Sequence, residues 1–193
     1  EHFEALAGGL MCQAGRADFS VRAFDGIAER PVVYWWSPLE LDVYRRSEKL
    51  GETSPVRQGT STANNARFLR RPWEVGRGKL YRSRIFSGAC PPDMDWVPYV
   101  MGAAGRSWFE GLEDVLMWRS HGLEMKTTAG AALRNPAFHF LQGVAYSTIG
   151  QAFSSRVHRF ASIFSDKGAS VFPDNVDVIV TLMNSTNTRK LLT

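Results

Sequence analysis

The chain has 193 residues, of which 44% are apolar and 22% are charged, and its formal net charge is +4. These values are typical of a globular domain and exclude collagen, coiled coils and long disordered tracts. Two cysteines, Cys12 and Cys90, are too few for a disulfide framework and lack metal-knuckle spacing, so we expect a reducing, cytoplasmic environment. The sequence shows neither a signal peptide nor an apolar run of about eighteen residues, which predicts a protein without a membrane partner.

Two short strands are predicted near the N-terminus. Residues 19–24 alternate between apolar and polar side chains, which is typical of a strand with one buried face. Residues 31–36 form a short apolar run of β-branched and aromatic residues, which also indicates a strand.

A helix is expected to follow these strands. Ser37 and Glu40 have the spacing of a capping box, and Pro38 stands at the first helical position. The helix is predicted to run to about Lys49 and to be closed by Gly51, because glycine is favoured just beyond a helix end.

The middle of the chain, residues 56–146, is dense in Gly, Pro, Trp and Arg and shows only short periodic pieces. We predict short strands joined by long loops that carry function. Two further strands are expected at residues 159–164 and 169–172, joined as a hairpin by the turn Asp166–Gly168.

The C-terminal region predicts one amphipathic helix. Val176, Ile179, Val180 and Met183 recur at helical spacing, and Asp174 stands near the expected cap. The fold class that these elements predict is α+β, with a curved mixed sheet, long loops and few helices.

The domain organisation is predicted to be a single domain that spans residues 1–193. Because the chain opens without Met and ends without a polar tail, we expect it to be a piece of a longer protein. Residues 1–30 have two interpretations, as part of this domain or as the end of a preceding one.

Basic residues are concentrated early in the chain. Between Arg57 and Arg84 there are eight basic residues and one acidic residue, Glu74. Clustered Lys and Arg gain free energy from counterion release on binding phosphates, so a polyanion such as nucleic acid is a plausible partner. The alternative is a solvated basic face.

Catalytic patterns are few. The chain has no nucleophile elbow, its four histidines lack metal-ligand spacing, and Gly76-Arg77-Gly78 is too short for a phosphate loop. Asp93 with Glu124 and Lys126 has the outline of a Mg²⁺-dependent nuclease core, which stays open as an alternative function. No metal site is otherwise predicted.

The segment Gln58–Trp73 is the most distinctive part of the sequence. It reads QGTSTANNARFLRRPW, a loop of small hydroxyl and amide residues that leads into an arginine-rich edge. Asn and Gln can pair with adenine and Arg with guanine, while Ser and Thr suit phosphate oxygens. The alternative is a polar turn in which Asn64 and Asn65 take positive φ.

This segment resembles the start of the target-recognition region of adenine-specific DNA methyltransferases of the BREX phage-defence type and of related type IIG restriction-methylation proteins. The resemblance starts at Pro31-Val32-Val33-Tyr34-Trp35 and continues in order to about Ser185. The downstream stretches that carry it are Trp73-Glu74-Val75, Trp96-Val97-Pro98-Tyr99 with Gly102, Arg106-Ser107-Trp108-Phe109 with Val115 and Trp118, Arg134-Asn135, residues 143–147, Ser155-Arg156, residues 168–172 and residues 182–185.

Two departures from that family stand out. Met101 occupies a position near which the family carries a basic residue, and the Asn-Pro-Pro-Tyr segment that holds the target adenine is absent, because Pro91-Pro92 is flanked by Cys90 and Asp93. The resemblance therefore implies a specificity domain without the catalytic and S-adenosylmethionine-binding half. A non-catalytic protein-interaction module remains a further alternative.

The resemblance and the residue chemistry together give a set of candidate DNA contacts. Gln58, Asn64, Asn65 and Arg67 are expected at base edges, and Thr60, Thr62, Arg70 and Arg71 at the DNA backbone. The other stretches add Arg106, Arg134, Asn135 and Arg156. We expect no cofactor in this chain, S-adenosylmethionine in the parent enzyme, and three kinds of partner: double-stranded DNA, the catalytic domain of the same polypeptide and other defence-system proteins.

The tryptophans are expected to anchor the core more often than to stack on bases, because large aromatic side chains are usually buried. This applies to Trp73, Trp96, Trp108 and Trp118.

Overall fold

A computed structural model of the chain describes residues 20–103, 105–147 and 153–192. The chain divides into two units, residues 1–49 and residues 50–193. This division does not test the prediction of one specificity domain, which stays a prediction, as do both interpretations of residues 1–30. Among the described residues, no helix is both long and apolar enough to cross a membrane.

The first unit is built around a small apolar cluster. Phe24, Ile27, Val33 and Leu41 are buried together in it. Val21–Phe24 forms a 3-10 helix, η1, and residues 31–36 contain a turn closed by the Trp36 N–H donating to the Val33 carbonyl at 2.9 Å. The two predicted strands are therefore wrong over the described residues, and Phe19 lies outside them. Phe24 and Val33 from these segments pack with Leu41 of helix α2 (Pro38–Arg46), and no strand forms there.

Helix α2, Pro38–Arg46, confirms the predicted helix start. The Glu40 N–H donates to the Ser37 hydroxyl at 3.2 Å, and the Ser37 N–H donates to the Glu40 carboxylate at 2.6 Å. The predicted end is wrong. The backbone becomes extended at Ser47, and Gly51 lies inside the separate short helix α3, Leu50–Thr53.

The second unit contains two mixed sheets, where the sequence predicted one. The five-stranded sheet has the order β1-β9-β6-β7-β4, and the four-stranded sheet has the order β2-β5-β3-β8. The first comprises β1 Val56–Arg57, β9 Ser170–Val171, β6 Val144–Tyr146, β7 Ser155–Val157 and β4 Trp108–Phe109. The second comprises β2 Leu69–Arg70, β5 Asp114–Met117, β3 Trp96–Val100 and β8 Ile163–Phe164. Neighbouring strands are antiparallel except for the β4/β7 and β3/β8 pairs.

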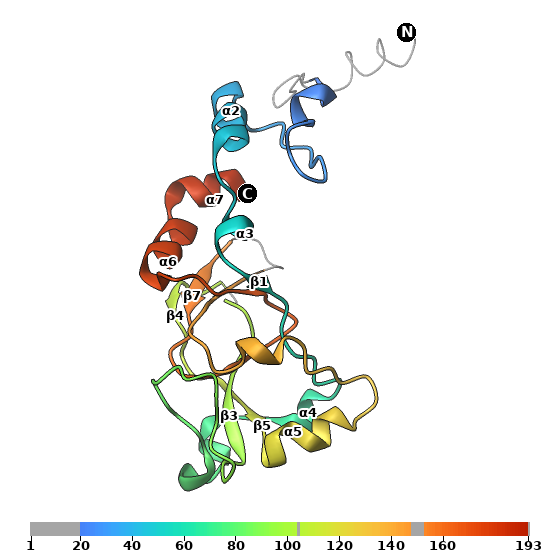
Figure 1. Cartoon of the computed structure of the whole chain (residues 1–193), viewed down its shortest axis with the longest axis vertical. Coiled ribbons are helices and arrows are strands. Elements are labelled where there is room, and N and C mark those ends of the chain that lie inside the picture. The colour runs from blue at the N-terminus through green and yellow to red at the C-terminus, as the bar shows by residue number, and fades with distance from the viewer. Residues whose placement is uncertain (1–19, 104, 148–152, 193) are drawn as a thin grey trace, which may run out of the picture. The chain divides into compact units, whose positions relative to one another are not determined.

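Few helices accompany these sheets, which confirms the predicted α+β class. In Figure 1, α6 (Val176–Asn184) and α7 (Thr186–Leu192) lie toward β4 and β7, whereas α4 (Asn65–Phe68) and α5 (Arg119–Lys126) lie toward β3 and β5. The remaining helical turns are η2 Pro72–Glu74, η3 Arg77–Lys79 and η4 Pro136–Phe138. The predicted short strands with long loops between residues 56 and 146 are confirmed.

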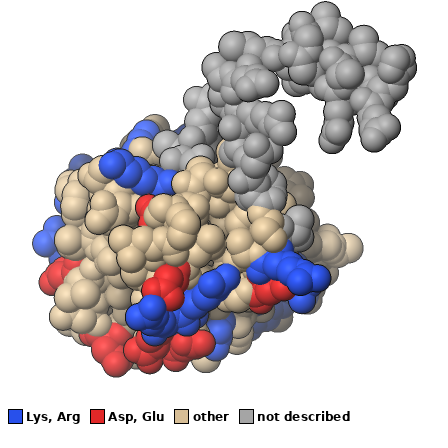
Figure 2. Space-filling view, turned by 90° about the horizontal axis from the view of Figure 1, so that it is seen from above, with Lys and Arg blue, Asp and Glu red and all other residues tan. Residues whose placement is uncertain are grey.

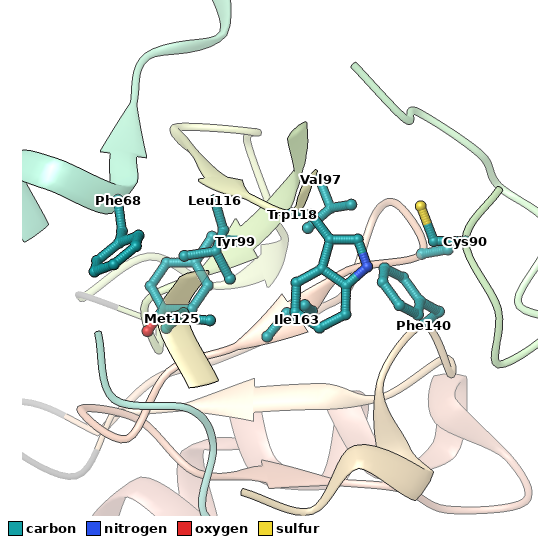
Figure 3. Close-up of a cluster of buried hydrophobic side chains, with 10 residues drawn as sticks. Phe68, Cys90, Val97, Tyr99, Leu116, Trp118, Met125, Phe140 and Ile163 are labelled. Carbon is teal, nitrogen blue, oxygen red and sulfur yellow. The ribbon is translucent and has the colours of Figure 1, made fainter. Parts of the chain in front are cut away.

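The main core lies on the four-stranded sheet. Figure 3 shows Val97, Tyr99, Leu116 and Ile163 from its strands among Phe68, Met125, Trp118 and Phe140. A second cluster joins the two sheets, because Val100 and Phe164 from one pack against Ala145 from the other. The sheets therefore share a continuous interior, which is the main stabilising element of such a domain.

Strands β8 and β9 correct the predicted hairpin. They do not pair with each other: β8 runs parallel to β3, and β9 lies between β1 and β6. The turn between them crosses from one sheet to the other and passes close to Gly102, because a Cβ at Gly168 would lie 2.3 Å from the Gly102 Cα. Both strands are fully buried as members of larger sheets, whereas an isolated two-stranded ribbon is only marginally stable in water.

Helix α6 confirms the predicted amphipathic helix, but Asn175 caps it rather than Asp174. The Val178 N–H donates to the Asn175 side-chain oxygen at 3.1 Å. At the other end, Asn184 exchanges two hydrogen bonds with the Ser155 backbone, at 3.1 and 2.8 Å. A helix is thereby fixed to β7 through a buried amide.

His158 makes the stability of the fold dependent on pH. Its side chain is buried beside the Ser170 hydroxyl, and burial lowers its pKa to about 4. The unfolded chain binds a proton at this residue below about pH 6.5, and the folded chain does not until about pH 4. The neutral, buried His158 therefore contributes to the free energy of unfolding at neutral pH, and this contribution is lost as the pH falls from 6.5 toward 4.

We expect this contribution to be about 2 kcal/mol smaller at pH 5 than at pH 7.5. Urea unfolding gives the free energy of unfolding of the wild-type protein and of His158→Gln at both pH values. The difference in pH dependence between the two proteins is the His158 contribution. Burial raises the pKa values of Glu110 and Asp114, which act in the opposite sense but equally in both proteins. An identical pH dependence in the variant would contradict the assignment.

Candidate nucleic-acid interface

The distinctive loop begins with a segment that is held inside the domain. The Thr60 N–H donates to the Phe164 carbonyl at 2.7 Å, and the Tyr99 hydroxyl donates to the Thr60 carbonyl at 2.7 Å. Burial raises the pKa of Tyr99, which keeps this hydroxyl protonated as the donor. Gly59 permits the close approach, because a Cβ there would lie 2.1 Å from the Phe164 carbonyl oxygen.

This attachment corrects the expectation for two hydroxyls. Thr60 is 0% exposed and Thr62 is 4% exposed, so neither faces a phosphate group in this conformation. The Thr62 hydroxyl instead donates to the Asn65 side-chain oxygen. Both threonines build the base of the loop.

The exposed part of the loop is residues 63–67. Asn64 caps α4 by accepting a hydrogen bond from the Arg67 N–H at 3.0 Å. The alternative of a turn with positive φ at Asn64 is not found: Asn64 has a φ of −144°, and Ala63 takes the positive φ of 56°. The short helix therefore presents Asn64, Asn65 and Arg67 at the surface.

A second segment lies beside this loop. The Asn135 amide donates to the Gln58 carbonyl at 2.8 Å, and Arg134 lies 3.9 Å from the Asp166 carboxylate. Asn65 and Thr62 line a hollow of about 280 Å³ together with residues of the β8–β9 turn. Its lining also includes Met101, the position near which the resembling family carries a basic residue. The structure thus brings Arg134 and Asn135 beside the loop, with Asn135 bonded to its first residue, Gln58.

Arg67 forms an ion pair with Glu124 of α5. Its Nη2 and Nε atoms lie 2.6 and 3.0 Å from one carboxylate oxygen. Both side chains are about half exposed, at 51% and 43%. A surface pair of this kind contributes about 0–1 kcal/mol, less than the roughly 1–3 kcal/mol of a bidentate guanine contact. The Arg67 side chain can therefore exchange Glu124 for a base.

Three other candidate arginines gather on a separate group of carboxylates. Arg71 lies 3.2 Å from Asp114, and Arg106 and Arg156 both pair with Glu113. Burial raises the pKa of Asp114, and the Arg71 charge opposes that rise. Arg71 connects this group to the end of the loop segment, because the antiparallel pairing of β2 with β5 places it beside Asp114.

Arg156 and Arg70 are held by the protein itself. Arg156 is 2% exposed and donates from Nε to the Gly102 carbonyl at 2.8 Å, which corrects its expected place on a DNA-binding face. Arg70 is partly buried and donates to the backbone carbonyls of Ala66 and Leu69 at 2.7 and 2.6 Å. Both guanidinium groups stabilise loops.

The nuclease alternative gains no support. Glu124 is engaged by Arg67, and Asp93 lies in an exposed turn where its carbonyl accepts from Lys79 at 3.1 Å. Within residues 20–103, 105–147 and 153–192 there is no group of three or more His, Cys, Asp or Glu side chains that could hold a metal ion.

Two tryptophans depart from the expected core positions. Trp118 is buried, at 6% exposure, but Trp73 and Trp108 are 79% and 53% exposed. Trp96 is partly buried on β3. Large exposed aromatic side chains are typical of contact surfaces rather than of cores.

The surface charges are extensively mixed. Figure 2 shows basic and acidic side chains next to one another on the face it displays. This agrees with the ion pairs of Arg67, Arg71 and Arg106, each with a carboxylate. Much of the basic charge that the sequence shows is therefore compensated within the protein.

Comparison with known proteins gives one informative similarity. The chain matches no model of a protein family. Over 163 residues, 79% of its length, it is 29% identical to the adenine-specific methyltransferase PglX of Lacticaseibacillus casei (strain Zhang). The match covers 13% of that protein, so the chain corresponds to a small segment of it. The chain is thus similar to part of a methyltransferase.

Gly59→Ala tests the attachment of the loop. A Cβ would collide with the backbone of β8, so we expect the variant to lose about 1–3 kcal/mol of unfolding free energy. Gly76→Ala is the matched control, because no atom lies within 4 Å of its added Cβ. Chemical denaturation measures both, and equal stabilities of the two variants would refute the packing argument.

Proposed function

We propose that this chain is the sequence-specific DNA recognition segment of an adenine-specific, S-adenosylmethionine-dependent DNA methyltransferase that acts in phage defence or restriction-modification. The observation that carries the proposal is the similarity of 79% of the chain to PglX. The exposed amide and arginine side chains of residues 64–67 support a role in binding DNA rather than in methyl transfer.

The chemistry of methyl transfer belongs, in this proposal, to the rest of the parent protein. The Pro91-Pro92 dipeptide is exposed between the buried Cys90 and Asp93, and neither of these sequence neighbours is the Asn or Tyr of an Asn-Pro-Pro-Tyr segment. Burial raises the pKa of Cys90 to about 11, so this thiol is not a nucleophile at neutral pH. These residues do not fit S-adenosylmethionine chemistry, and we derive no catalytic step from them.

Recognition would use the loop as a rigid platform. Its buried base, Gly59 and Thr60, fixes where α4 begins, and α4 presents Asn65 and Arg67 to solvent. Asn can form two hydrogen bonds with adenine, and Arg can do so with guanine, in the major groove. Gln58, Asn64, Arg134 and Asn135 lie near this platform and complete the proposed surface. Arg71 and Arg106 would contact phosphates after release from their carboxylates.

The parent enzyme must also move its target base. Extruding an adenine from a duplex costs a few kcal/mol of stacking and pairing. A recognition segment that holds the flanking duplex supplies binding energy for this step. Trp73 and Trp108, both exposed, are candidates for contact with the catalytic domain.

Arg67→Gln is the direct test of base recognition. A preferred sequence is first selected from a randomised duplex pool with the wild-type chain. We then expect the variant to bind that sequence about 5- to 150-fold more weakly, which corresponds to the loss of one bidentate base contact of about 1–3 kcal/mol, and to bind unrelated duplexes almost unchanged. Fluorescence anisotropy measures both affinities. Failure of the wild-type chain to bind any duplex would refute the proposed function.

Glu124→Gln has the opposite expected effect. It removes the carboxylate that competes with DNA for Arg67, so duplex affinity should rise by up to about fivefold at low salt. Asp42→Asn is the matched control, because it changes the net charge equally and frees Arg46 from its own ion pair in the other unit. A similar gain in both variants would show that net charge alone is responsible.

A further inference from the structure

A basic surface outside the candidate contacts lies where residues 77–84 run beside residues 159–161. Between residues 75 and 92 there are four basic residues and no acidic one, namely Arg77, Lys79, Arg82 and Arg84. The Ala161 N–H donates to the Ser83 carbonyl at 2.9 Å, so the two segments are adjacent. Arg82 and Arg84, on either side of Ser83, are both exposed.

Arg84 and Arg159 converge on one aromatic ring. Their guanidinium carbons lie 5.8 and 5.2 Å from the centroid of the Phe160 ring. Phe160 itself is 9% exposed, so the ring is a fixed support for two exposed cations. Contact with the ring face limits the freedom of both side chains and holds like charges near each other.

These cations differ from five of the six candidate arginines in their charge balance. Arg67, Arg71, Arg106, Arg134 and Arg156 each have a carboxylate within 4 Å. In the described part of the chain, no carboxylate lies that close to Arg82, Arg84 or Arg159. An anion that binds there gains attraction from both Arg84 and Arg159 without first breaking an ion pair.

A hollow of about 410 Å³ lies at the same place. Arg84, Phe86, Phe109, Gln142, His158 and Arg159 line it. Phe109 is 66% exposed, and His158 is neutral at pH 7 because it is buried. Guanidinium groups bind phosphate oxygens bidentately, and exposed aromatic rings accept a sugar or base. This combination suits a nucleotide chain better than an acidic protein segment.

We propose that Arg84 and Arg159, flanked by Arg82, form a phosphate-binding site for the DNA backbone, separate from the loop of residues 58–71. The site rests on the proposed function, because it takes DNA as the ligand of this chain. It provides sequence-independent affinity, whereas the loop provides selectivity.

The test compares the salt dependence of DNA binding by the full chain and by the double variant R84Q/R159Q. Fluorescence anisotropy measures the affinity for a labelled 30-base-pair duplex and for one of its strands alone. Comparison of the two affinities shows whether the site binds the phosphates of duplex or of single-stranded DNA. The control is R30Q/R46Q, which removes the same net charge from two arginines that already have carboxylate partners.

We expect the salt slope to fall by roughly two units in R84Q/R159Q, so that wild type loses roughly tenfold more affinity than this variant between 50 and 200 mM salt. The control should keep the wild-type slope. If R84Q/R159Q fails to fold, Arg82→Gln replaces it, with an expected loss of roughly one unit.

Three outcomes would overturn the site. Wild-type binding with an unchanged slope in the double variant refutes the site alone and leaves the proposed function standing. Absence of salt-dependent DNA binding by the wild-type chain refutes both. Loss of binding to labelled poly-glutamate without loss of DNA binding assigns the surface to an acidic protein instead.

Discussion

The backbone contact between Gly59–Thr60 and Phe164 is the constraint on which the candidate interface depends. It forms only because Gly59 has no side chain, and it fixes the loop to a strand inside the core. The burial of Thr60 and Thr62 follows from it, as does the position at which Ala63 turns the chain outward. A buried attachment of this kind lets a short segment hold exposed recognition side chains without ordering them anew on binding.

Capping residues and apolar periodicity predicted the helices, because a helix is formed by contacts between residues close together in the sequence. The capping box at Ser37 and Glu40 marked the start of α2, and apolar periodicity marked α6. Pairing partners were not predictable in this way. The segments before α2 have strand-like composition but pack on a helix, and β8 and β9 enter different sheets. Strand placement depends on contacts between distant segments, which periodicity does not report.

The candidate site shows the same division. Residue types predicted the loop with its amide and arginine groups as a DNA contact, and residues 63–67 of the loop are exposed. The ion pairs could not be predicted, because Arg67 and Glu124 are 57 residues apart and Arg156 and Glu113 are 43 apart. The burial of Arg156 could not be predicted either, because arginine is rarely buried without a partner and the sequence does not show that partner. Charge counted along the sequence thus overestimates the charge available to a ligand.

Many residues that carry the family resemblance stabilise this fold. Tyr99 holds the loop, Gly102 and Gly168 let two backbone segments meet, and Trp118 fills the core. These residues therefore form a scaffold that positions the exposed side chains of the loop, such as Asn65 and Arg67. Under the proposed function, substitutions among these exposed side chains would change DNA binding at little cost in stability, because they lie away from packing contacts.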